Sequence, residues 1–278
     1  MTTPSPIVPL IYETHMHTPL CRHAEGEPGA YAAVAEAKGL KGIIVTCHAP
    51  LPDGYSPGVR MCRDQWRAYV DLVAAAREVW AGRVDIRLGL ESDFLPGLEP
   101  WLEELHAREP LHYVLGSVHP QTPEYQDRYL GDDPQAYHRQ YFESLAEAAE
   151  TGLFDCLSHP DLVKNYGSHA WDLSAMMDPI RRCLDRVAAT GIAMELNTSG
   201  LLKTVPEMNP APEILAEMSV RGIPVVVGAD AHRPERVAAN FSEAYDLLEE
   251  AGYRQVRIYL DRQPRDFPIA DARKSLKI

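Results

Sequence analysis

Short apolar runs alternate with longer amphipathic stretches along nearly the whole chain. Seven runs occupy residues 9–14, 41–46, 85–90, 112–117, 154–158, 191–197 and 223–228, and a weaker eighth occupies 256–260. Their length and their β-branched residues are typical of strands, whereas the stretches between them have the length and periodicity of helices. Strand and helix in regular alternation predict parallel strands joined by helical crossovers, which restricts the chain to α/β folds.

The stretches between the runs predict helices over 29–39, 63–80, 99–108, 133–152, 173–191, 211–222 and 241–252. Glycine closes several of them, at Gly39, Gly152, Gly191, Gly222 and Gly252. Glycine adopts the left-handed conformation without strain, so this pattern indicates helix ends that lead into the next strand. Seven or eight such units favour a closed barrel over an open sheet. No Pro/Gly/Ser-rich linker divides the sequence, so we predict one domain over residues 1–278.

Histidine or an acidic residue follows within a few positions of the end of six of the seven runs. In chain order these residues are His15 and His17, His48, Glu91, His119, His159, and Asp230 with His232, while His23 follows the first run on a loop. Residues two apart on a strand point to the same side, as His15 and His17 do here. Because the carboxyl ends of barrel strands form one rim, where active sites are built, we expect all nine side chains around one pocket.

Imidazole and carboxylate groups together suit zinc, iron or manganese. Nine ligands are too many for one ion, since a catalytic zinc usually takes three protein groups, so the number predicts a multinuclear site with room for three metals. Four other histidines lie in helices or loops or just before a strand, and we interpret them as structural: His106, His112, His138 and His169.

Composition excludes several classes of protein. The formal net charge of −13 argues against sequence-independent binding of nucleic acid, which needs a basic surface. The five cysteines are scattered without a CxxC pair, which favours free thiols in a reducing cytoplasm over a disulfide framework. The N-terminal residues 1–12 lack a signal-peptide pattern, and no apolar run approaches the ~20 residues of a membrane span. We therefore expect a cytoplasmic protein with a small-molecule substrate and no membrane partner.

The motifs HMHTPLCRHAEG, TCHAP, GLESDF, GSVH, SHPDL and GADAH together resemble the polymerase-and-histidinol-phosphatase (PHP) family. The resemblance is strongest to the monofunctional histidinol-phosphate phosphatases and runs from about Tyr12 to beyond Asp230. It implies a distorted (β/α)7 TIM-like barrel with three divalent metal ions, Zn, Fe or Mn, at the C-terminal rim. The implied reaction is hydrolysis of L-histidinol phosphate to L-histidinol and phosphate, with metal-bound hydroxide as the nucleophile.

The resemblance also implies a distribution of the ligands. By position, the first metal takes His15, His17, Glu91 and Asp230, the second takes Glu91, His119 and His159, and the third takes His23, His48 and His232. Where relatives often have an acid before the histidine of the second strand, this chain has Cys47. The missing acid would orient a liganding histidine, so the substitution bears on the third metal.

Roles in the reaction follow from the same likeness. We interpret Asp230 as the proton acceptor from the nucleophile, and either His232 or a metal-bound water as the acid for the leaving group. The candidate substrate-binding residues are Arg60, Lys164, Asn197 with the adjacent Thr198, and Arg233, and Asp161 is a weaker candidate partner for a substrate ammonium.

Other functions remain open at this point. An amidohydrolase also carries a His-x-His motif after its first strand and an aspartate after its last. It binds one or two metals, so counting the bound metal ions would distinguish it from a PHP protein with three. A non-catalytic PHP domain of the kind attached to polymerases would have lost ligands, whereas this chain retains all nine. A PHP phosphoesterase acting on another small phosphomonoester or a nucleotide would be distinguished by its substrate.

Overall fold

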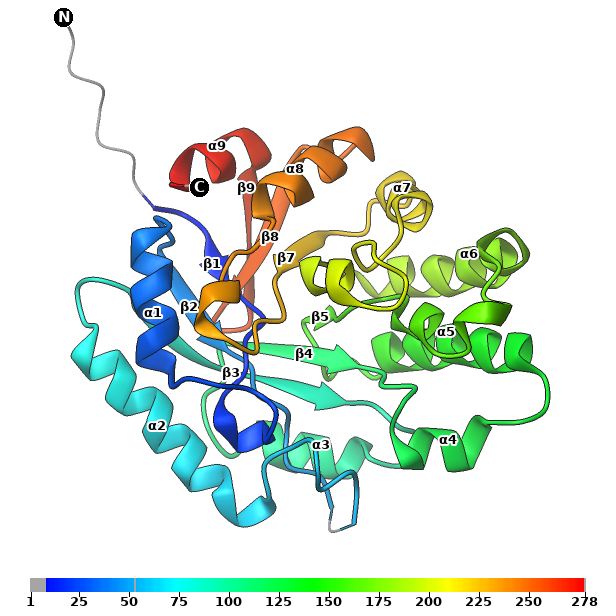
Figure 1. The fold of residues 1–278 in the computed structure, drawn as a ribbon, viewed down its shortest axis with the longest axis horizontal. Helices are drawn as coiled ribbons and strands as arrows, with labels where there is room; N and C mark the ends of the chain where they lie inside the picture. Colours follow the sequence, from blue (N-terminus) through cyan, green and yellow to red (C-terminus); the bar gives the residue numbers. More distant parts are fainter. Residues whose placement is uncertain (1–8, 53, 278) are drawn as a thin grey trace, which may run out of the picture.

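The computed structural model describes residues 9–52 and 54–277 and forms a sheet of seven strands in the order β1 to β7 (Figure 1). Each strand pairs in parallel with the next along the chain. The strands are β1 Tyr12–Glu13, β2 Gly42–Val45, β3 Asp85–Asp93, β4 Tyr113–Ser117, β5 Cys156–Leu157, β6 Ala193–Asn197 and β7 Val225–Gly228. Residues 1–8, on which part of the signal-peptide prediction rests, lie outside the described residues.

The sheet curls until its first and last strands meet beyond their ends. Met16 and Ala231 form a parallel bridge. Ala231 donates its backbone N–H to His15 O at 2.9 Å and accepts one from His17 at 2.9 Å. The barrel is therefore nearly closed, which confirms the distorted (β/α)7 TIM-like fold, and the closing bonds lie within the segments that carry His15 and His17.

Helices connect and cover the strands (Figure 1). They are α1 Pro28–Ala37, α2 Trp66–Val79, α3 Glu99–His106, α4 Pro123–Tyr129, α5 Pro134–Glu150, α6 Leu173–Thr190, α7 Pro212–Val220, α8 Phe241–Glu250 and α9 Ile269–Ser275. The five glycines expected at helix ends all have positive φ, from 68° at Gly222 to 99° at Gly252. The predicted helices are confirmed, whereas the seven-residue helices α4 and α9 were missed because so short a segment carries little periodicity.

The weak eighth run is not part of the barrel. It forms β8, Gln255–Leu260, which pairs antiparallel with β9, Gln263–Pro268. The linking residues Asp261 and Arg262 have φ of 55° and 61°, as a tight two-residue hairpin turn requires. Tyr259 stacks on Tyr113, the first residue of β4, with ring centroids 5.6 Å apart. The hairpin thus covers the amino-terminal end of the barrel and leaves the carboxyl end open for a site.

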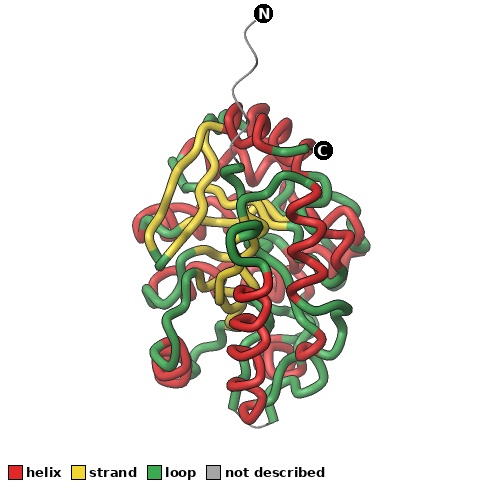
Figure 2. Tube along the Cα trace, turned by 90° about the vertical axis from the view of Figure 1, so that its left-hand side faces the viewer, coloured by secondary structure: helices red, strands yellow, loops and turns green. Residues whose placement is uncertain are grey.

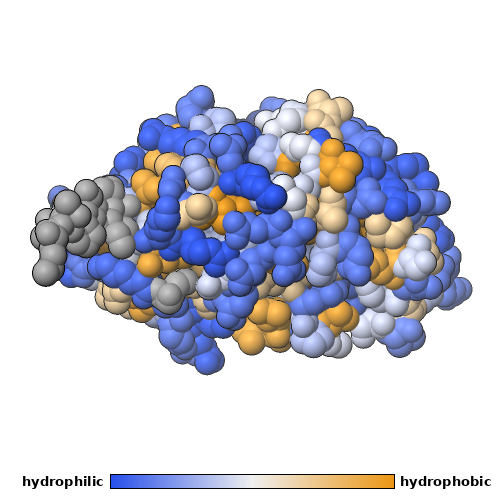
Figure 3. Space-filling model, turned by 90° about the horizontal axis from the view of Figure 1, so that it is seen from above, coloured by the Kyte–Doolittle hydropathy of each residue, from blue (hydrophilic) through white to orange (hydrophobic). Residues whose placement is uncertain are grey.

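Figure 2 shows the strands gathered inside the helices, with the β8–β9 hairpin at one side. The face in Figure 3 is mostly hydrophilic, and its hydrophobic residues are scattered, as on an ordinary water-facing surface. Among the described residues, no helix combines the length and the apolar character needed to cross a membrane.

Candidate metal centre

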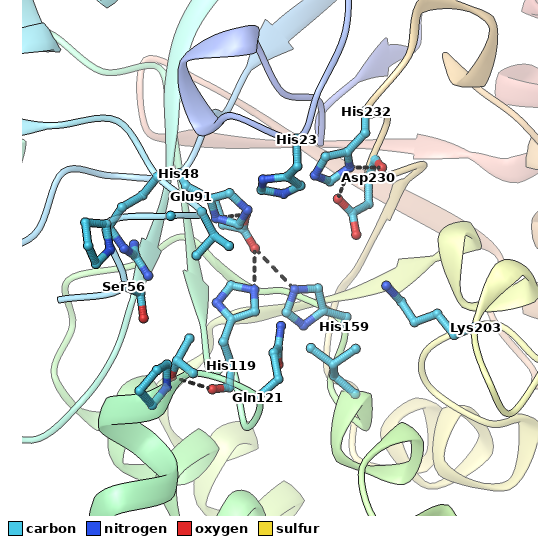
Figure 4. A pocket seen from close by; sticks show the side chains of 17 residues that line it. His23, His48, Ser56, Glu91, His119, Gln121, His159, Lys203, Asp230 and His232 are labelled. Carbon is cyan, nitrogen blue, oxygen red and sulfur yellow. Dashed lines mark hydrogen bonds and ion pairs between the residues drawn. The ribbon is translucent and has the colours of Figure 1, made fainter.

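Glu91 of β3 lies at the centre of the nine predicted ligands (Figure 4). Its Oε2 atom lies 2.9 Å from His48 Nδ1 and 3.5 Å from the Nε2 atoms of both His15 and His17. His48 also forms an isolated parallel bridge with Glu91, which places the two segment ends side by side. One carboxylate oxygen therefore faces three imidazoles from the first and second strand ends.

The other oxygen of Glu91 faces the opposite side of the barrel. Oε1 lies 3.2 Å from His159 Nε2 and 3.5 Å from His119 Nε2. Ser117 donates its hydroxyl to the same oxygen at 2.6 Å, which holds the carboxylate in place. His119 and His159 each stand two residues beyond a strand end, as the sequence predicts. Two sets of imidazoles on two oxygens of one carboxylate form the arrangement expected of a bridging ligand.

Asp230 faces the first of these sets. Its Oδ1 atom lies 3.1 Å from His17 Nε2 and 3.5 Å from His15 Nε2, and Oδ2 accepts a hydrogen bond from Ser199 Oγ at 3.0 Å. The φ of Asp230 is 47° and that of His159 is 28°, a left-handed conformation that costs a residue with a side chain about 1–3 kcal/mol. Such strain clusters at functional sites.

His23 and His232 complete the cluster on the side of His17. The rings of His17 and His232 are stacked with centroids 4.0 Å apart, and the ring of His23 lies 4.6 Å from that of His232 and 5.4 Å from that of His48. The structure thus brings together all nine residues that the sequence predicts as ligands.

Carboxylates outside the cluster orient two of these histidines. Glu195 Oε1 lies 2.8 Å from His15 Nδ1, and Asp93 Oδ2 lies 3.1 Å from His119 Nδ1. A carboxylate on the far nitrogen of a liganding histidine fixes its tautomer and ring orientation. Sequence reasoning missed both acids, although an acidic residue inside the apolar run 191–197 was a usable signal for Glu195.

The surroundings of the cluster shift the pKa values of its histidines and carboxylates. Burial is the main reason that the pKa of His48 is lowered to about 3, and the nearby His17 and His119 lower it further against the opposing effect of Glu91. Burial also lowers the pKa of His232 to about 2. Although burial raises it, the pKa of Glu91 is held well below its usual range by the histidines around it. At neutral pH His48 and His232 therefore offer neutral imidazole lone pairs beside a carboxylate. The carboxylates around His15 and His17 outweigh burial and raise the pKa of both imidazoles, to about 9 for His17, so a metal ion bound there would displace a proton.

Several atoms that point into the cluster are buried without a hydrogen-bond partner among the described residues: His15 Nε2, His48 Nδ1, Glu91 Oε2 and His232 Nε2. An unsatisfied buried polar atom is costly, and bound metal ions would satisfy these four. In each of three groups the ligand atoms lie within 4.8 Å of one another. The groups are His15, His17 and Asp230; His48, Glu91 and His119; and His17, His48 and His232. The donor set and its spacing fit several divalent ions.

A cavity of about 510 Å³ opens beside the cluster (Figure 4). Segment 56–60, in the loop after β2, supplies one wall, and residues 121–123 after β4 supply another. Lys203 points into the cavity from the side opposite His48, and it also borders a second cavity with Asp230, His232 and Arg233. The sequence gives no particular signal for Lys203, because it follows a strand end that carries no ligand.

The structure corrects the prediction for Lys164 and Asp161. Both side chains are fully buried, and Lys164 Nζ lies 2.9 Å from Asp161 Oδ2 and 3.0 Å from Glu207 Oε1. Asn209 Nδ2 and the backbone N–H of Ala211 also donate to Asp161. The short 3₁₀ helix Leu162–Asn165 turns Lys164 into the protein, so neither residue borders the cavity.

Lys164→Ala is therefore expected to destabilise the fold by about 3–5 kcal/mol, because Asp161 would remain as a buried charge without its partner. Chemical denaturation measures this loss, and the KM for a phosphate ester should change little in the variant that remains folded. Unchanged stability together with a raised KM would contradict the structural role.

Asn197 and Thr198 also lie away from the cavity. Asn197 donates to Glu195 Oε2 at 2.9 Å and accepts from the backbone of Ser199 at 2.9 Å, and Thr198 donates to Ala239 O at 2.7 Å. The prediction that they bind substrate is corrected: Asn197 instead holds Glu195, the acid behind His15.

Arg60 and Arg233 do border cavities. Arg60 lines the main cavity, but its guanidinium already pairs with Asp93, at 2.6 Å from Oδ2, and donates to Ala49 O. It thereby also fixes the acid that orients His119. Arg233 lines the second cavity and lies 3.2 Å from Glu25 at the surface. Their contact with a substrate stays a prediction.

Cys47 bears on a different histidine from the one expected. Its Sγ atom accepts hydrogen bonds from the backbone and the hydroxyl of Thr18, at 3.5 and 3.2 Å. Because neighbouring residues of an extended segment point to opposite sides, Cys47 faces the segment of His17 while His48 faces Glu91. The structure therefore places Cys47 beside His17 and Cys21, and its bearing on the third metal stays a prediction.

A nearly closed parallel barrel, with histidines and carboxylates converging beside a cavity at its strand ends, defines a metal-binding protein of the TIM-like class. More narrowly, the chain belongs to the PHP domain family, whose model matches residues 13–199.

Known proteins similar to this chain include a probable histidinol-phosphatase of Deinococcus radiodurans. It is 38% identical over an alignment of 252 residues that covers 88% of this chain and 95% of that protein. The histidinol-phosphatase of Bacillus subtilis is 24% identical, over 85% of this chain and 97% of its own length. The histidinol phosphate phosphatase of Lactococcus lactis, solved with zinc, L-histidinol and phosphate, superposes with a TM-score of 0.77 at 19% identity, over 91% and 98% of the two chains. At that identity the structural match supports the fold alone.

Proposed function

We propose that this protein hydrolyses L-histidinol phosphate to L-histidinol and phosphate at a centre of three divalent metal ions. The observation that carries the proposal is Glu91, with three imidazoles at one carboxylate oxygen and two at the other, beside a cavity of small-molecule size. The named relatives that match nearly the whole chain supply the substrate.

The nine predicted ligands would divide among the three metal ions. The first ion would take His15, His17, Glu91 and Asp230, the second Glu91, His119 and His159, and the third His23, His48 and His232. Bound metals would activate water at neutral pH and neutralise the charge on phosphoryl oxygens. This assignment leaves His48 between two sites, since it lies near both Glu91 and His232.

The protein's own groups perform the remaining tasks. Asp230 accepts a proton from the attacking water, and its second oxygen is held ready by Ser199. The candidate donors to the leaving alkoxide are His232, whose ring is part of the cavity wall, and a metal-bound water; because burial lowers the pKa of His232 to about 2, we favour the water. Lys203 lines the cavity and attracts the phosphate dianion, whereas the sequence pointed to Lys164 as the substrate-binding lysine. We further propose a single catalytic domain over 1–278 and a cytoplasmic location, where its five free thiols remain reduced.

The metal count tests this proposal. Elemental analysis of protein purified without chelator and reconstituted with zinc should find about three equivalents per chain, since each would take three or four of the nine ligands. One equivalent or fewer would refute the trinuclear centre, and two would favour an amidohydrolase-like site.

Lys203→Ala should lower kcat/KM for phosphomonoesters about 10–100-fold, the worth of a hydrogen bond between two charged groups. Inhibition by inorganic phosphate should weaken in parallel, while zinc content stays at the wild-type level. Lys274→Ala, an exposed lysine on α9, is the matched control. Equal phosphate inhibition in both variants would remove Lys203 from the phosphate site.

A further inference from the structure

His17 differs from the other histidines of the centre in what lies behind its ring. Four of them, His15, His23, His119 and His232, place Nδ1 at 2.8–3.1 Å from an oxygen. Nδ1 of His17 is buried without a hydrogen-bond partner among the described residues. Leaving an imidazole N–H buried without an acceptor is costly, so an acceptor of another kind is expected there.

Two thiols occupy that place. A ring nitrogen of His17 and the Sγ atoms of Cys21 and Cys47 all lie within 4.8 Å of one another. Because Nε2 is turned toward Asp230, 3.1 Å away, we assign Nδ1 as the nitrogen beside the sulfurs. Both cysteines are fully buried. Sulfur is a weak acceptor with long hydrogen bonds, which explains why no partner of ordinary geometry is found on Nδ1.

The two thiols have different roles because of Thr18. Thr18 donates to Cys47 Sγ through both its backbone N–H and its hydroxyl, at 3.5 and 3.2 Å. Cys47 in turn donates its S–H to Thr18 O at 3.6 Å, and its Sγ lies within 4.8 Å of that of Cys21. With Cys47 acting as the acceptor at the end of this chain, Cys21 directs its S–H to Cys47 and keeps its lone pairs for His17.

We propose that Cys21 is the positioning residue of His17: its sulfur accepts the hydrogen bond from His17 Nδ1, which leaves the Nε2 lone pair aimed at Asp230 and Glu91. This inference rests on the proposed metal centre, in which His17 is a ligand. A neutral thiol orients the ring without adding charge to a site that already holds two carboxylates, whereas Glu195 and Asp93 add negative charge behind His15 and His119.

The positioning role of Cys21 is tested by the zinc affinity of the metal-free protein. Competition with a chromophoric chelator measures this affinity. Cys21→Ala should weaken one of the bound equivalents about 10–100-fold, the usual cost of removing a group that orients a metal ligand. Cys21→Ser retains an acceptor and should bind nearly as the wild type does. Should the alanine variant not fold, Cys21→Val fills the space without an acceptor and should show the same loss as a folded protein.

Cys183→Ala is the matched control, since Cys183 is also a buried thiol but lies in α6. It should cost comparable stability and leave zinc affinity unchanged. Wild-type zinc affinity in both Cys21→Ala and Cys21→Val would overturn the inference while the metal centre stands, whereas a wild-type protein that binds no zinc would refute the proposed function itself.

Cys21 is also within 4.8 Å of the ligand atoms of His23 and His232, so direct coordination has to be separated from positioning. Cobalt substitution does this, because thiolate bound to cobalt gives a sulfur-to-metal charge-transfer band. The inference predicts the same near-ultraviolet spectrum with and without the Cys21 sulfur. A band that disappears in Cys21→Ser would overturn it by making Cys21 a ligand.

Discussion

Glu91→Gln is expected to lower turnover at least ~10²-fold and to reduce the zinc content, because the bridging negative charge between two ions is lost. The amide keeps the shape of the side chain, but only one of its two ends can serve as a lone-pair donor. One of the two sets of imidazoles would then face an N–H₂ group in place of an oxygen. The sets are His15, His17 and His48 on one side and His119 and His159 on the other.

Steady-state kinetics and elemental analysis of the same preparation measure both effects. Glu104→Gln provides the control, since Glu104 is an exposed residue of α3 that pairs with Arg108. It should retain full activity and metal. A Glu91→Gln variant with wild-type metal content and near-normal turnover would show that this carboxylate does not bridge two ions.

The ligand cluster could be predicted because it follows from two regularities. Parallel strands bring their carboxyl ends to one rim, and residues two apart on a strand share a side. His15 with His17 and Asp230 with His232 satisfy both regularities, and the structure places all four within one cluster. For these four residues backbone topology was therefore sufficient, with no knowledge of loop conformation.

Residues outside the strand ends could not be placed in the same way. Lys164 and Lys203 both follow strands by several residues, yet one is turned inward to Asp161 and the other points into the cavity. The difference lies in the path of two 3₁₀ segments, Leu162–Asn165 and Thr198–Leu202, and tertiary contacts rather than local periodicity decide that path. The same holds for β8, whose apolar pattern suits a barrel strand but whose partner is β9.

The substrate selectivity is expected to be large. For L-histidinol phosphate, kcat/KM should exceed that for p-nitrophenyl phosphate by orders of magnitude, although the aryl leaving group is easier to expel. Beyond the metal cluster the cavity offers polar groups at Ser56, Gln121 and Thr122 and apolar ones at Val59 and Leu162. These groups can contact an amine and an imidazole, and binding energy from such a remote part of the substrate appears in turnover as well as in affinity.

The most direct test of the account is phosphate release by the zinc-loaded protein from L-histidinol phosphate, p-nitrophenyl phosphate and a nucleoside monophosphate, measured in parallel. The account predicts that kcat/KM is highest for L-histidinol phosphate by orders of magnitude and that removal of zinc by a chelator abolishes the activity. Equal hydrolysis of the aryl ester, a clear preference for the nucleotide, or full activity in verified metal-free protein would contradict it.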